Sequence, residues 1–301
     1  MKEFQLIEKI KGLIPGNLQG TIPIGDDAAL VASGPESLLF TTDVIVEGVD
    51  FRMEKGGARP EQIGYKALAV NLSDIAAMGG KPLAFVAAFG IPKKISEAWI
   101  ARLSKSLVRL ARKFRVSWVG GDISKSDRLF ISIALLGRVE KGRAVLRKGA
   151  RKGDSIYVTG SLGGSLKGKH LNFTPRVREG EFLASRFRPT AMIDISDGFI
   201  QDLEHILKAS NVGASIELNR IPVSAAAQKS LRAALTDGED FELLFTLAAA
   251  KGKKLETAWP QNFPRVLLTR VGEITGGRGI HWRTKGKTVK LWFRKKGYTH
   301  F

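Results

Sequence analysis

The most uniformly apolar stretch of the chain is KALAVNLSDIAAMGG, at residues 66–80. Ala, Leu and Met favour helix and a glycine pair readily caps one, so the pattern predicts a helix over residues 67–78 that ends at Gly79-Gly80. Because nearly every face of this helix is apolar, we expect it to be buried. Asp74, with Asn71 one turn earlier on the same face, is then costly unless it meets a cation or hydrogen-bond donors. A capping or solvated Asp is the alternative.

The first half of the chain alternates between β-type and helical patterns. The predicted order is a helix over 1–14 closed by Pro15-Gly16, strands over 21–33 and 37–48, a loop over 52–60, the helix over 67–78, a strand over 83–92, a helix over 98–114 capped by Ser96, and strands over 116–121 and 129–139. Most of these strands end next to an acidic residue.

The second half begins after a basic segment over 140–152. Its predicted elements are a strand from residue 154 that runs into a glycine-rich turn ending at 165, a short helix over 179–184, a strand, an Asp-rich turn and a helix within 191–210, a strand over 214–223, a helix over 225–235, an acidic turn and strand over 236–247, and a hairpin over 281–293 turning at Lys285-Gly286. The glycine-rich turn does not match a dinucleotide or Walker fingerprint.

These patterns predict a two-domain protein of the α/β (α+β) class. At 301 residues the chain is long enough for two domains of ordinary size, and the basic segment is the predicted boundary. The first domain, 1–139, is expected to be a mixed sheet with helices, and the second, 140–301, an α/β domain.

Composition narrows the class of protein. Hydrophobic residues at 44% and charged residues at 26% are typical of a globular chain. The absence of cysteine excludes disulfides, thiolate metal sites and cysteine nucleophiles. The first residues are amphipathic but interrupted by charge, unlike a secretory signal, and no apolar run is long enough to span a bilayer. We therefore expect a soluble cytoplasmic protein that does not associate with membranes.

The net charge of +19 would attract nucleic acid, anionic membranes or phosphorylated small molecules. Many basic residues are scattered singly, and the denser runs at 143–152 and 283–296 lack an aromatic RNA-binding signature. A solvated basic surface is favoured over a nucleic-acid footprint.

Acidic residues recur where β-runs give way to loops or helices, the places where sheet folds display ligand sites. They are Asp26, Asp27, Asp43, Asp74, Asp122, Asp194 and Asp197. Oxygen donors without nearby His or Cys select hard cations, Mg²⁺ above all. Converging carboxylates would repel one another unless divalent ions or bound phosphates separated them, which points to nucleotide phosphates.

Other interpretations of these acids stay open. Taken singly, Asp26 or Asp197 is better read as a turn or cap residue. Ca²⁺ storage competes, although the EF-hand spacing is absent. A two-carboxylate glycosidase is also compatible with the spacing.

Five segments carry a family resemblance: Gly25-Asp26-Asp27-Ala28-Ala29, Thr41-Thr42-Asp43, KALAVNLSDIAAMGG, Val119-Gly120-Gly121-Asp122 and IDISDG from Ile193. Together they resemble the thiamine-monophosphate kinase family, within the superfamily of aminoimidazole ribonucleotide synthetase. The similarity extends to the final GYTHF, and the KALAVNLSD block is its most specific part. It implies direct in-line, Mg²⁺-assisted transfer of the ATP γ-phosphate onto thiamine monophosphate, giving thiamine diphosphate. It also implies a homodimer built through the N-terminal domains, which bind ATP and Mg²⁺, with the C-terminal domain closing the active site.

The resemblance also assigns roles to individual residues. It implies several Mg²⁺ ions, held by Asp27, Thr41, Thr42, Asp43, Asp74, Asp122, Asp194 and Asp197, of which Asp74, Asp122 and Asp197 are the expected catalytic residues. The positions matching ATP contacts are Gly121, Asp122, Arg147 and Ser196, and those near the thiamine moiety are Asp50, Glu239 and Tyr298. Because the acceptor is already an ionised phosphate, no general base is needed, and neutralising and aligning two polyanions is the main task. A carboxylate and an aromatic face suit the thiazolium cation.

Two segments depart from the family pattern. The acidic turn is TDGED, where the family usually has two glycines before the Glu, so Asp237 is expected to alter the loop that places Glu239. The stretch after Ser165 is short and is expected to lack part of a helix.

Other activities within the superfamily share some of these residues. A purine-pathway amide synthetase shares the Asp-rich phosphate site and is the alternative enzyme. Selenophosphate synthetase and the hydrogenase-maturation member depend on cysteine or selenocysteine, which a cysteine-free chain disfavours. A nucleic-acid-binding protein with a decayed site would be expected to have lost several of these acids.

Overall fold

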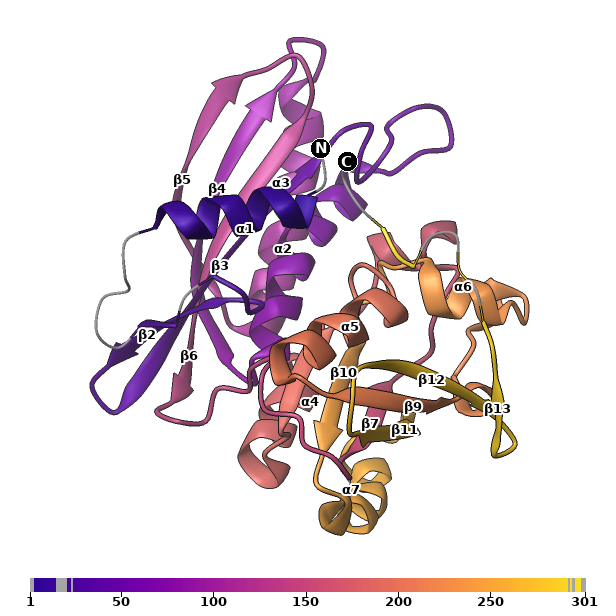
Figure 1. The fold of residues 1–301 in the computed structure, drawn as a ribbon. Coiled ribbons are helices and arrows are strands. Elements are labelled where there is room, and N and C mark those ends of the chain that lie inside the picture. The colour runs from indigo at the N-terminus through magenta and orange to yellow at the C-terminus, as the bar shows by residue number, and fades with distance from the viewer. Residues whose placement is uncertain (1–2, 15–20, 23, 292, 294–295, 299–301) are drawn as a thin grey trace.

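The computed structural model describes residues 3–14, 21–22, 24–291, 293 and 296–298. It contains two mixed β-sheets with helices packed on them, so the predicted α/β class is confirmed (Figure 1). The predicted closure of the first helix at Pro15-Gly16 and the last residues of the C-terminal tail lie outside the described residues. The first helix, α1, spans Glu3–Leu13.

The N-terminal sheet has the strand order β1-β2-β3-β6-β4-β5. Its strands are β1 Thr21–Ile22, β2 Ala29–Ser33, β3 Glu36–Val46, β4 Lys81–Ile91, β5 Ser117–Lys125 and β6 Phe130–Glu140. Only β4 and β5 pair in parallel, because the helix α3, Glu97–Phe114, carries the chain back between them. The predicted single run over 21–33 is in fact two strands, separated by a bend that contains Asp26 and Asp27.

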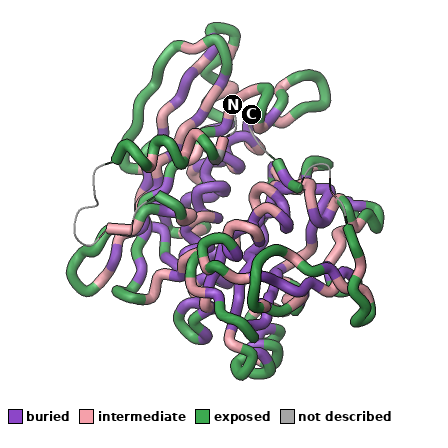
Figure 2. The backbone as a smooth tube through the Cα atoms, in the orientation of Figure 1, coloured by how far each residue is buried: buried purple, intermediate pink, exposed green. Residues whose placement is uncertain are grey.

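The central helix α2 spans Pro60–Ala77 and is almost wholly buried, as its all-round apolar pattern predicts (Figure 2). It begins at Pro60 rather than at residue 67, and proline suits a first helical position because that amide has no helical partner. The predicted glycine stop is confirmed: Gly79 has a φ of 69°, and a Cβ there would lie 2.4 Å from the Cβ of Ala184. Gly64 lets α3 approach closely, since a Cβ there would lie 2.3 Å from the Leu103 carbonyl oxygen.

The second sheet has the order β13-β12-β9-β11-β7-β10-β8, and only β12 and β9 pair in parallel. Its strands are β7 Ser155–Thr159, β8 Ala191–Asp194, β9 Gly213–Glu217, β10 Leu243–Leu247, β11 Leu268–Thr275, β12 Gly279–Thr284 and β13 Lys287–Val289. Its α-helices are α4 Val177–Phe182, α5 Phe199–Ser210, α6 Leu231–Thr236 and α7 Ala249–Asn262. The hairpin turn predicted at Lys285-Gly286 is confirmed.

Three local features of this half differ from, or add to, the prediction. The helix expected over 225–235 is broken, because Gln228 and Lys229 adopt positive φ between a 3₁₀ turn and α6. The short stretch after Ser165 forms two 3₁₀ turns, Ser165–Lys167 and Lys169–Leu171. The prediction omitted β11 and α7; only Gly252, Leu255 and Trp259 of α7 are buried, so its apolar stripe is faint.

Two hydrophobic cores hold the elements together. The larger core gathers α2, α3 and the N-terminal sheet, and also takes in Tyr157, Phe245 and Trp259 from the second half. The smaller core lies between the second sheet and α5, around Ile193, Leu203 and similar residues. No strand occurs over residues 141–154, between the two sheets. The exact domain boundary at 139/140 stays a prediction.

Candidate active site

The strand β3 and the helix α2 bring the first acids together. Odd-numbered residues of β3 face α2, so Thr41 and Asp43 point toward the helix. The Thr41 hydroxyl donates a short hydrogen bond to the Asp74 carboxylate, and the Asp43 amide donates to Asn71 Oδ1 at 3.1 Å. Asn71 and Asp74 of the apolar helix therefore both receive hydrogen bonds from β3.

A carboxylate cluster forms where three separate segments meet. One oxygen atom from each of Asp27, Asp74 and Asp194 lies within 4.8 Å of the other two. Asp27 comes from the bend before β2 and Asp194 from the end of β8. The Ser73 hydroxyl donates to Asp194 Oδ2 at 2.6 Å, so α2 positions this carboxylate as well. Segments up to 167 residues apart in the chain thus place three acids around one point.

Burial and mutual repulsion disfavour the ionised forms of these acids. Burial raises the pKa of Asp43 to about 6 and that of Asp194 to about 7, and at Asp194 the charge of Asp27 adds to the shift. Burial, followed by the charges of Asp43 and Asp194, raises the pKa of Asp74 well above its ordinary value. A divalent cation would relieve both causes at once, and an all-oxygen donor set of carboxylates and hydroxyls suits a hard cation.

Arg147 approaches the cluster from the segment between the two sheets. Its guanidinium Nη2 lies 2.9 Å from Asp27 Oδ1, and its backbone amide donates to Asp26 Oδ1 at 2.6 Å. Asp26 therefore holds the backbone of Arg147, a local anchoring role of the kind expected for this residue taken singly. The guanidinium is thus paired with a carboxylate of the cluster, and it is a group of the kind that binds phosphate.

A cavity of about 210 Å³ extends from the cluster toward the other predicted substrate residues. Its described lining includes Asp43, Asp74, Asp194, Ser196 and Asp197, together with Asp50, Lys66, Glu239 and Tyr298. All three residues expected near the thiamine moiety therefore line the same cavity as Asp74. The Asp50 carboxylate also accepts the Val46 amide at 2.8 Å, which fixes the turn after β3.

Three of the residues predicted to bind Mg²⁺ or ATP lie apart from the cluster of Asp27, Asp74 and Asp194. Thr42 is exposed on the opposite face of β3 from Asp43, so its side chain points away from α2. Gly121 and Asp122 lie in the edge strand β5, and Asp122 pairs with Ala88, in the same row across the sheet as Val44. Within one chain the structure does not place Asp122 beside Asp74.

Asp197 lines the cavity but also belongs to a second acidic group. It lies with Asp202 and His205, one ligand atom of each being within 4.8 Å of the others. Asp202 accepts the amides of Asp197 and Gly198 at 3.1 and 3.0 Å, which fixes the turn at the start of α5. Burial raises the pKa of Asp202 well above its ordinary value.

The sequence interpretation missed Lys66 in this site. It is the first residue of the apolar stretch and shares a helix face with Val70 and Asp74, four and eight residues later. That spacing, applied to the helix, was the signal that could have identified it.

Comparisons with known proteins agree with this geometry. The model of the family "AIR synthase related protein, N-terminal domain" matches residues 25–139, which defines the class of the N-terminal half. A thiamine-monophosphate kinase of Rhodopirellula baltica is 39% identical over 300 residues, covering 94% of this chain and 92% of that protein. The thiamine-monophosphate kinase of Escherichia coli K12 is 36% identical over 330 residues, covering 99% and 98%. The chain belongs to the thiamine-monophosphate kinase family.

A solved structure leads to the same family. The structure described as AaThiL complexed with AMPPCP and TMP matches with a TM-score of 0.83 at 32% identity, covering 100% of this chain and 97% of that one. The predicted resemblance is confirmed, and so is the prediction that the chain is an enzyme of the kinase class. Within the described residues, no helix is both long and apolar enough to cross a membrane.

Proposed function

We propose that this chain transfers the γ-phosphate of ATP to thiamine monophosphate, giving thiamine diphosphate, by direct in-line displacement without a general base. One observation carries the proposal: Asp74 and Asp194, which form a carboxylate cluster with Asp27, line a cavity that is also lined by Asp50, Glu239 and Tyr298. A phosphate-handling cluster and a site suited to an organic cation are thereby joined in one space. The names of the relatives, and the AMPPCP and TMP bound in the AaThiL structure, support this pair of substrates.

The residues present fit Mg²⁺, and we propose that several ions bind here. The proposed ligands are Asp27, Thr41, Thr42, Asp43, Asp74, Asp122, Asp194 and Asp197, Thr42 through its backbone oxygen. When bound, Mg²⁺ would neutralise the charge of the phosphates and keep them aligned. Asp74 is the member of the set that lies on the buried helix α2.

The chain's own residues have three tasks in this proposal. Arg147 and Ser196 hold the phosphates of ATP, and we extend that role to Gly121 and Asp122 on the family pattern. Asp50 and Glu239 attract the thiazolium cation, and Tyr298 covers it. Catalysis then consists of positioning and charge stabilisation at the acids, chiefly Asp74, Asp122 and Asp197, because the acceptor oxygen is already ionised.

The acceptor distinguishes this activity from others of the superfamily. Purified protein with Mg²⁺ and ATP is expected to convert thiamine monophosphate to thiamine diphosphate and to leave free thiamine unphosphorylated, because the proposed mechanism uses an acceptor oxygen that is already ionised and the thiamine hydroxyl is not. Chromatography of the products, with inorganic phosphate release as a control for hydrolysis, measures both reactions. Full turnover of thiamine, or none of the monophosphate, would refute the assignment.

The raised pKa values predict how Mg²⁺ binding depends on pH. The folded, metal-free protein keeps protons on Asp43 and Asp194 that the unfolded chain has already lost, so its free energy of unfolding should fall as the pH rises from about 4 through about 7. Mg²⁺ must displace these protons, so its apparent affinity is expected to increase by up to about tenfold per pH unit for each displaced proton between about pH 5 and 7, and to level off above about pH 7. Mg²⁺ titrations at several pH values, followed by calorimetry, test this. An affinity independent of pH would contradict it.

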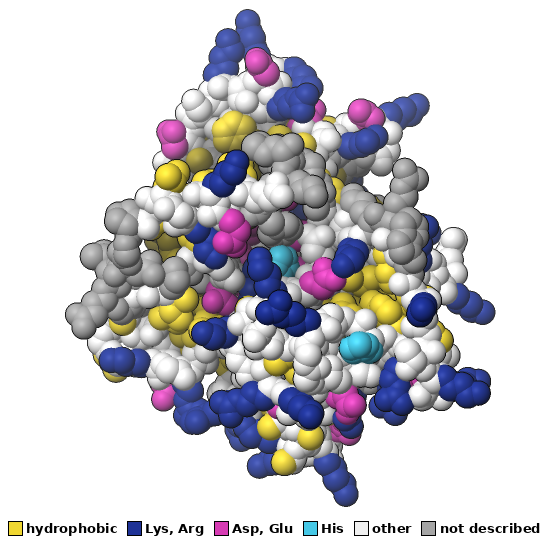
Figure 3. All heavy atoms as spheres, in the orientation of Figure 1, with side chains coloured by type: hydrophobic (Ala, Val, Ile, Leu, Met, Phe, Trp, Pro, Cys, Tyr) yellow, Lys and Arg dark blue, Asp and Glu magenta, His cyan; other side chains and the backbone are white. Residues whose placement is uncertain are grey.

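A homodimer is part of the proposal. The face of the N-terminal sheet opposite α2 exposes Phe40, Val44 and Val86, which are 50%, 52% and 42% exposed. An open apolar sheet face next to an edge strand, β5, is suited to pairing with a second copy. The basic side chains of the described residues form no comparable patch in the view of Figure 3, where Lys and Arg are spread among apolar and acidic side chains.

A further inference from the structure

Lys66 is a buried cation at the edge of a strongly acidic cavity. Its side chain is 1% exposed, and the other charged residues in the described lining are Asp43, Asp50, Asp74, Asp194, Asp197 and Glu239. The ammonium donates to Glu239 Oε1 and Oε2 at 2.8 and 2.7 Å and to the Asp50 carbonyl at 2.9 Å. All three N–H groups therefore have acceptors, as a buried ammonium requires.

The backbone of the Glu239 loop is fixed by the second half of the chain. The Glu239 amide donates to the Ser196 carbonyl at 2.6 Å, and the Phe241 amide donates to the Ile195 carbonyl at 2.8 Å. Both Glu239 and Phe241 have positive φ, 54° and 50°, which non-glycine residues adopt only where their surroundings enforce it. The loop is therefore held rigidly against the turn that carries Ser196 and Asp197.

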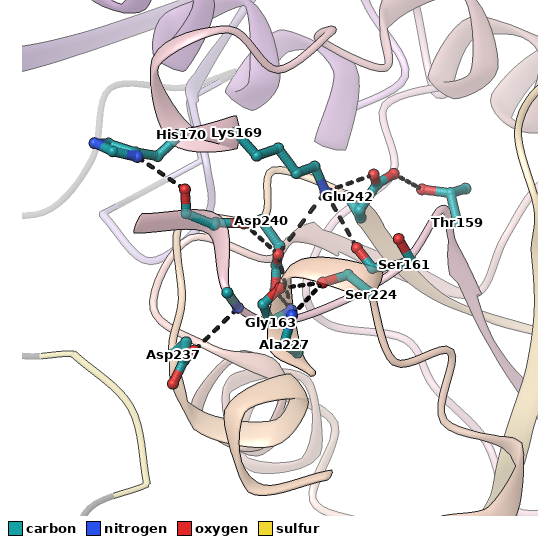
Figure 4. A network of polar contacts seen from close by, with 12 residues as sticks. Thr159, Ser161, Gly163, Lys169, His170, Ser224, Ala227, Asp237, Asp240 and Glu242 are labelled. Carbon is teal, nitrogen blue, oxygen red and sulfur yellow. Dashed lines mark hydrogen bonds and ion pairs between the residues drawn. The ribbon is translucent and has the colours of Figure 1, made fainter. Parts of the chain in front are cut away.

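Two carboxylates of the same loop bind the glycine-rich turn (Figure 4). Asp240 accepts the Gly163 amide at 2.8 and 3.0 Å and also the Ser165 hydroxyl. Asp237 accepts the Gly164 amide at 3.0 Å. Asp237, the residue that departs from the family pattern, thus adds a second tie between the loop and the turn.

The side chain of Glu239, unlike its backbone, is oriented from the first half of the chain. Lys66 lies 173 residues away in sequence and binds both carboxylate oxygens. Lys66 and Asp74 lie on one face of the rigid helix α2, eight residues or about 12 Å apart along its axis. Glu239 is consequently held at a set distance from the Asp74 carboxylate.

We propose that Lys66 is a positioning residue. Through it, α2 sets the distance between the phosphate end of the site, at Asp74, and the cation end, at Glu239 and Asp50. By holding Glu239 and the Asp50 carbonyl, it selects an organic cation that carries its phosphate at a matching distance. The inference rests on the proposed function and names a residue that determines specificity for the acceptor. ATP, whose phosphates meet the Asp74 end, does not depend on Lys66.

The test is a comparison of Michaelis constants in Lys66→Met, which keeps the length and apolar stem of the side chain. Without the ammonium, Glu239 is left among Asp50, Asp74 and Asp197, and repulsion should turn it toward solvent. The KM for thiamine monophosphate is expected to rise at least about tenfold while the KM for ATP changes less than about twofold. The double variant with Glu239→Gln should be no worse than the weaker-binding single variant, because the two residues act as one unit.

Lys94→Met is the matched control. Lys94 forms an ion pair with Glu47 at 3.3 Å, but its side chain is 67% exposed, so this change should leave both KM values as they are. Should Lys66→Met fail to fold, Lys66→Arg, which keeps the charge but changes the donor geometry, gives the same comparison with a smaller selective increase.

The outcomes separate the two proposals. Parallel increases in both KM values, or fully additive effects of the Lys66 and Glu239 changes, would refute the positioning role of Lys66 while leaving the kinase activity in place. A wild-type protein that neither turns over thiamine monophosphate nor binds it in calorimetry would refute both the proposed function and the positioning role of Lys66. Binding without turnover would overturn only the function, and the same variants would then be compared by dissociation constant.

Discussion

Replacing Asp74 with Asn is expected to lower kcat at least about a thousandfold without disrupting the fold. The substitution keeps the size of the side chain and an oxygen that can accept the Thr41 hydroxyl, but it removes a charge from the centre of the carboxylate cluster. In a site whose catalysis is electrostatic, that charge is what holds the proposed Mg²⁺ ions against the phosphates. Steady-state rates at saturating and limiting Mg²⁺ measure the effect.

The same variant should be more stable than the wild type when Mg²⁺ is absent. Asp74 is buried among like charges, which raises its pKa, so Asn removes repulsion from the folded state. Thermal unfolding in EDTA should show a higher Tm for Asp74→Asn, and added Mg²⁺ should raise the Tm of the wild type more than that of the variant.

Asp154→Asn is the control for the rate. Asp154 is a buried carboxylate that accepts the Thr190 hydroxyl at 2.6 Å and does not line the described cavity, so this change should leave kcat within about threefold of the wild type. An unchanged rate at limiting Mg²⁺ would remove Asp74 from the metal shell.

Val86→Asp is expected to convert the protein from dimer to monomer. Val86 lies on β4 in the middle of the exposed apolar face, in the row of Thr42 and Ala134, and a carboxylate buried there by a second copy would be unpaired. Light scattering should give twice the chain mass of 32.8 kDa for the wild type and the chain mass itself for the variant.

The control for Val86 is an equally exposed apolar residue outside the sheet face. Leu267 is 57% exposed and lies in the second half of the chain, so Leu267→Asp should remain dimeric. A wild-type protein that is monomeric at micromolar concentration, or a Val86→Asp variant that stays dimeric, would refute an interface at this face.

Local patterns were sufficient to predict most elements. The buried helix, its glycine stop and the hairpin at Lys285-Gly286 follow from short-range propensities that the tertiary structure reinforces. The prediction failed where local signals were weak or overridden. The helix expected over 225–235 is broken by left-handed residues, and α7 buries too few residues to show a clear period.

Some features of the candidate site were likewise predictable from the sequence, and others were not. The sequence indicated which acids were candidates, because most were expected where a β-run gives way to a loop or helix, and the structure gathers Asp27, Asp74 and Asp194 around one point. Asp43 and Asp122 instead lie inside β3 and β5, which continue beyond them. The period of two in the predicted strand already places Thr42 and Asp43 on opposite faces, but the sequence could not show that the face of Asp43 is the one that meets α2. Nor could it show that Lys66 meets Glu239, since that contact depends on how the two halves of the chain pack.

The sequence by itself determined the class of protein, its family and the chemical type of the site, because residue identity fixes charge, donor type and local propensity. Only the tertiary structure decided which of those residues share a cavity. Strand register sets the side of the sheet on which each side chain points, and the packing of α2 between the two halves brings together groups as distant as Lys66 and Glu239. Asp74 was a costly acid in the sequence and is a member of a cluster in the fold: the Thr41 hydroxyl of β3 donates to it, and β8 and the bend before β2 bring two further carboxylates beside it.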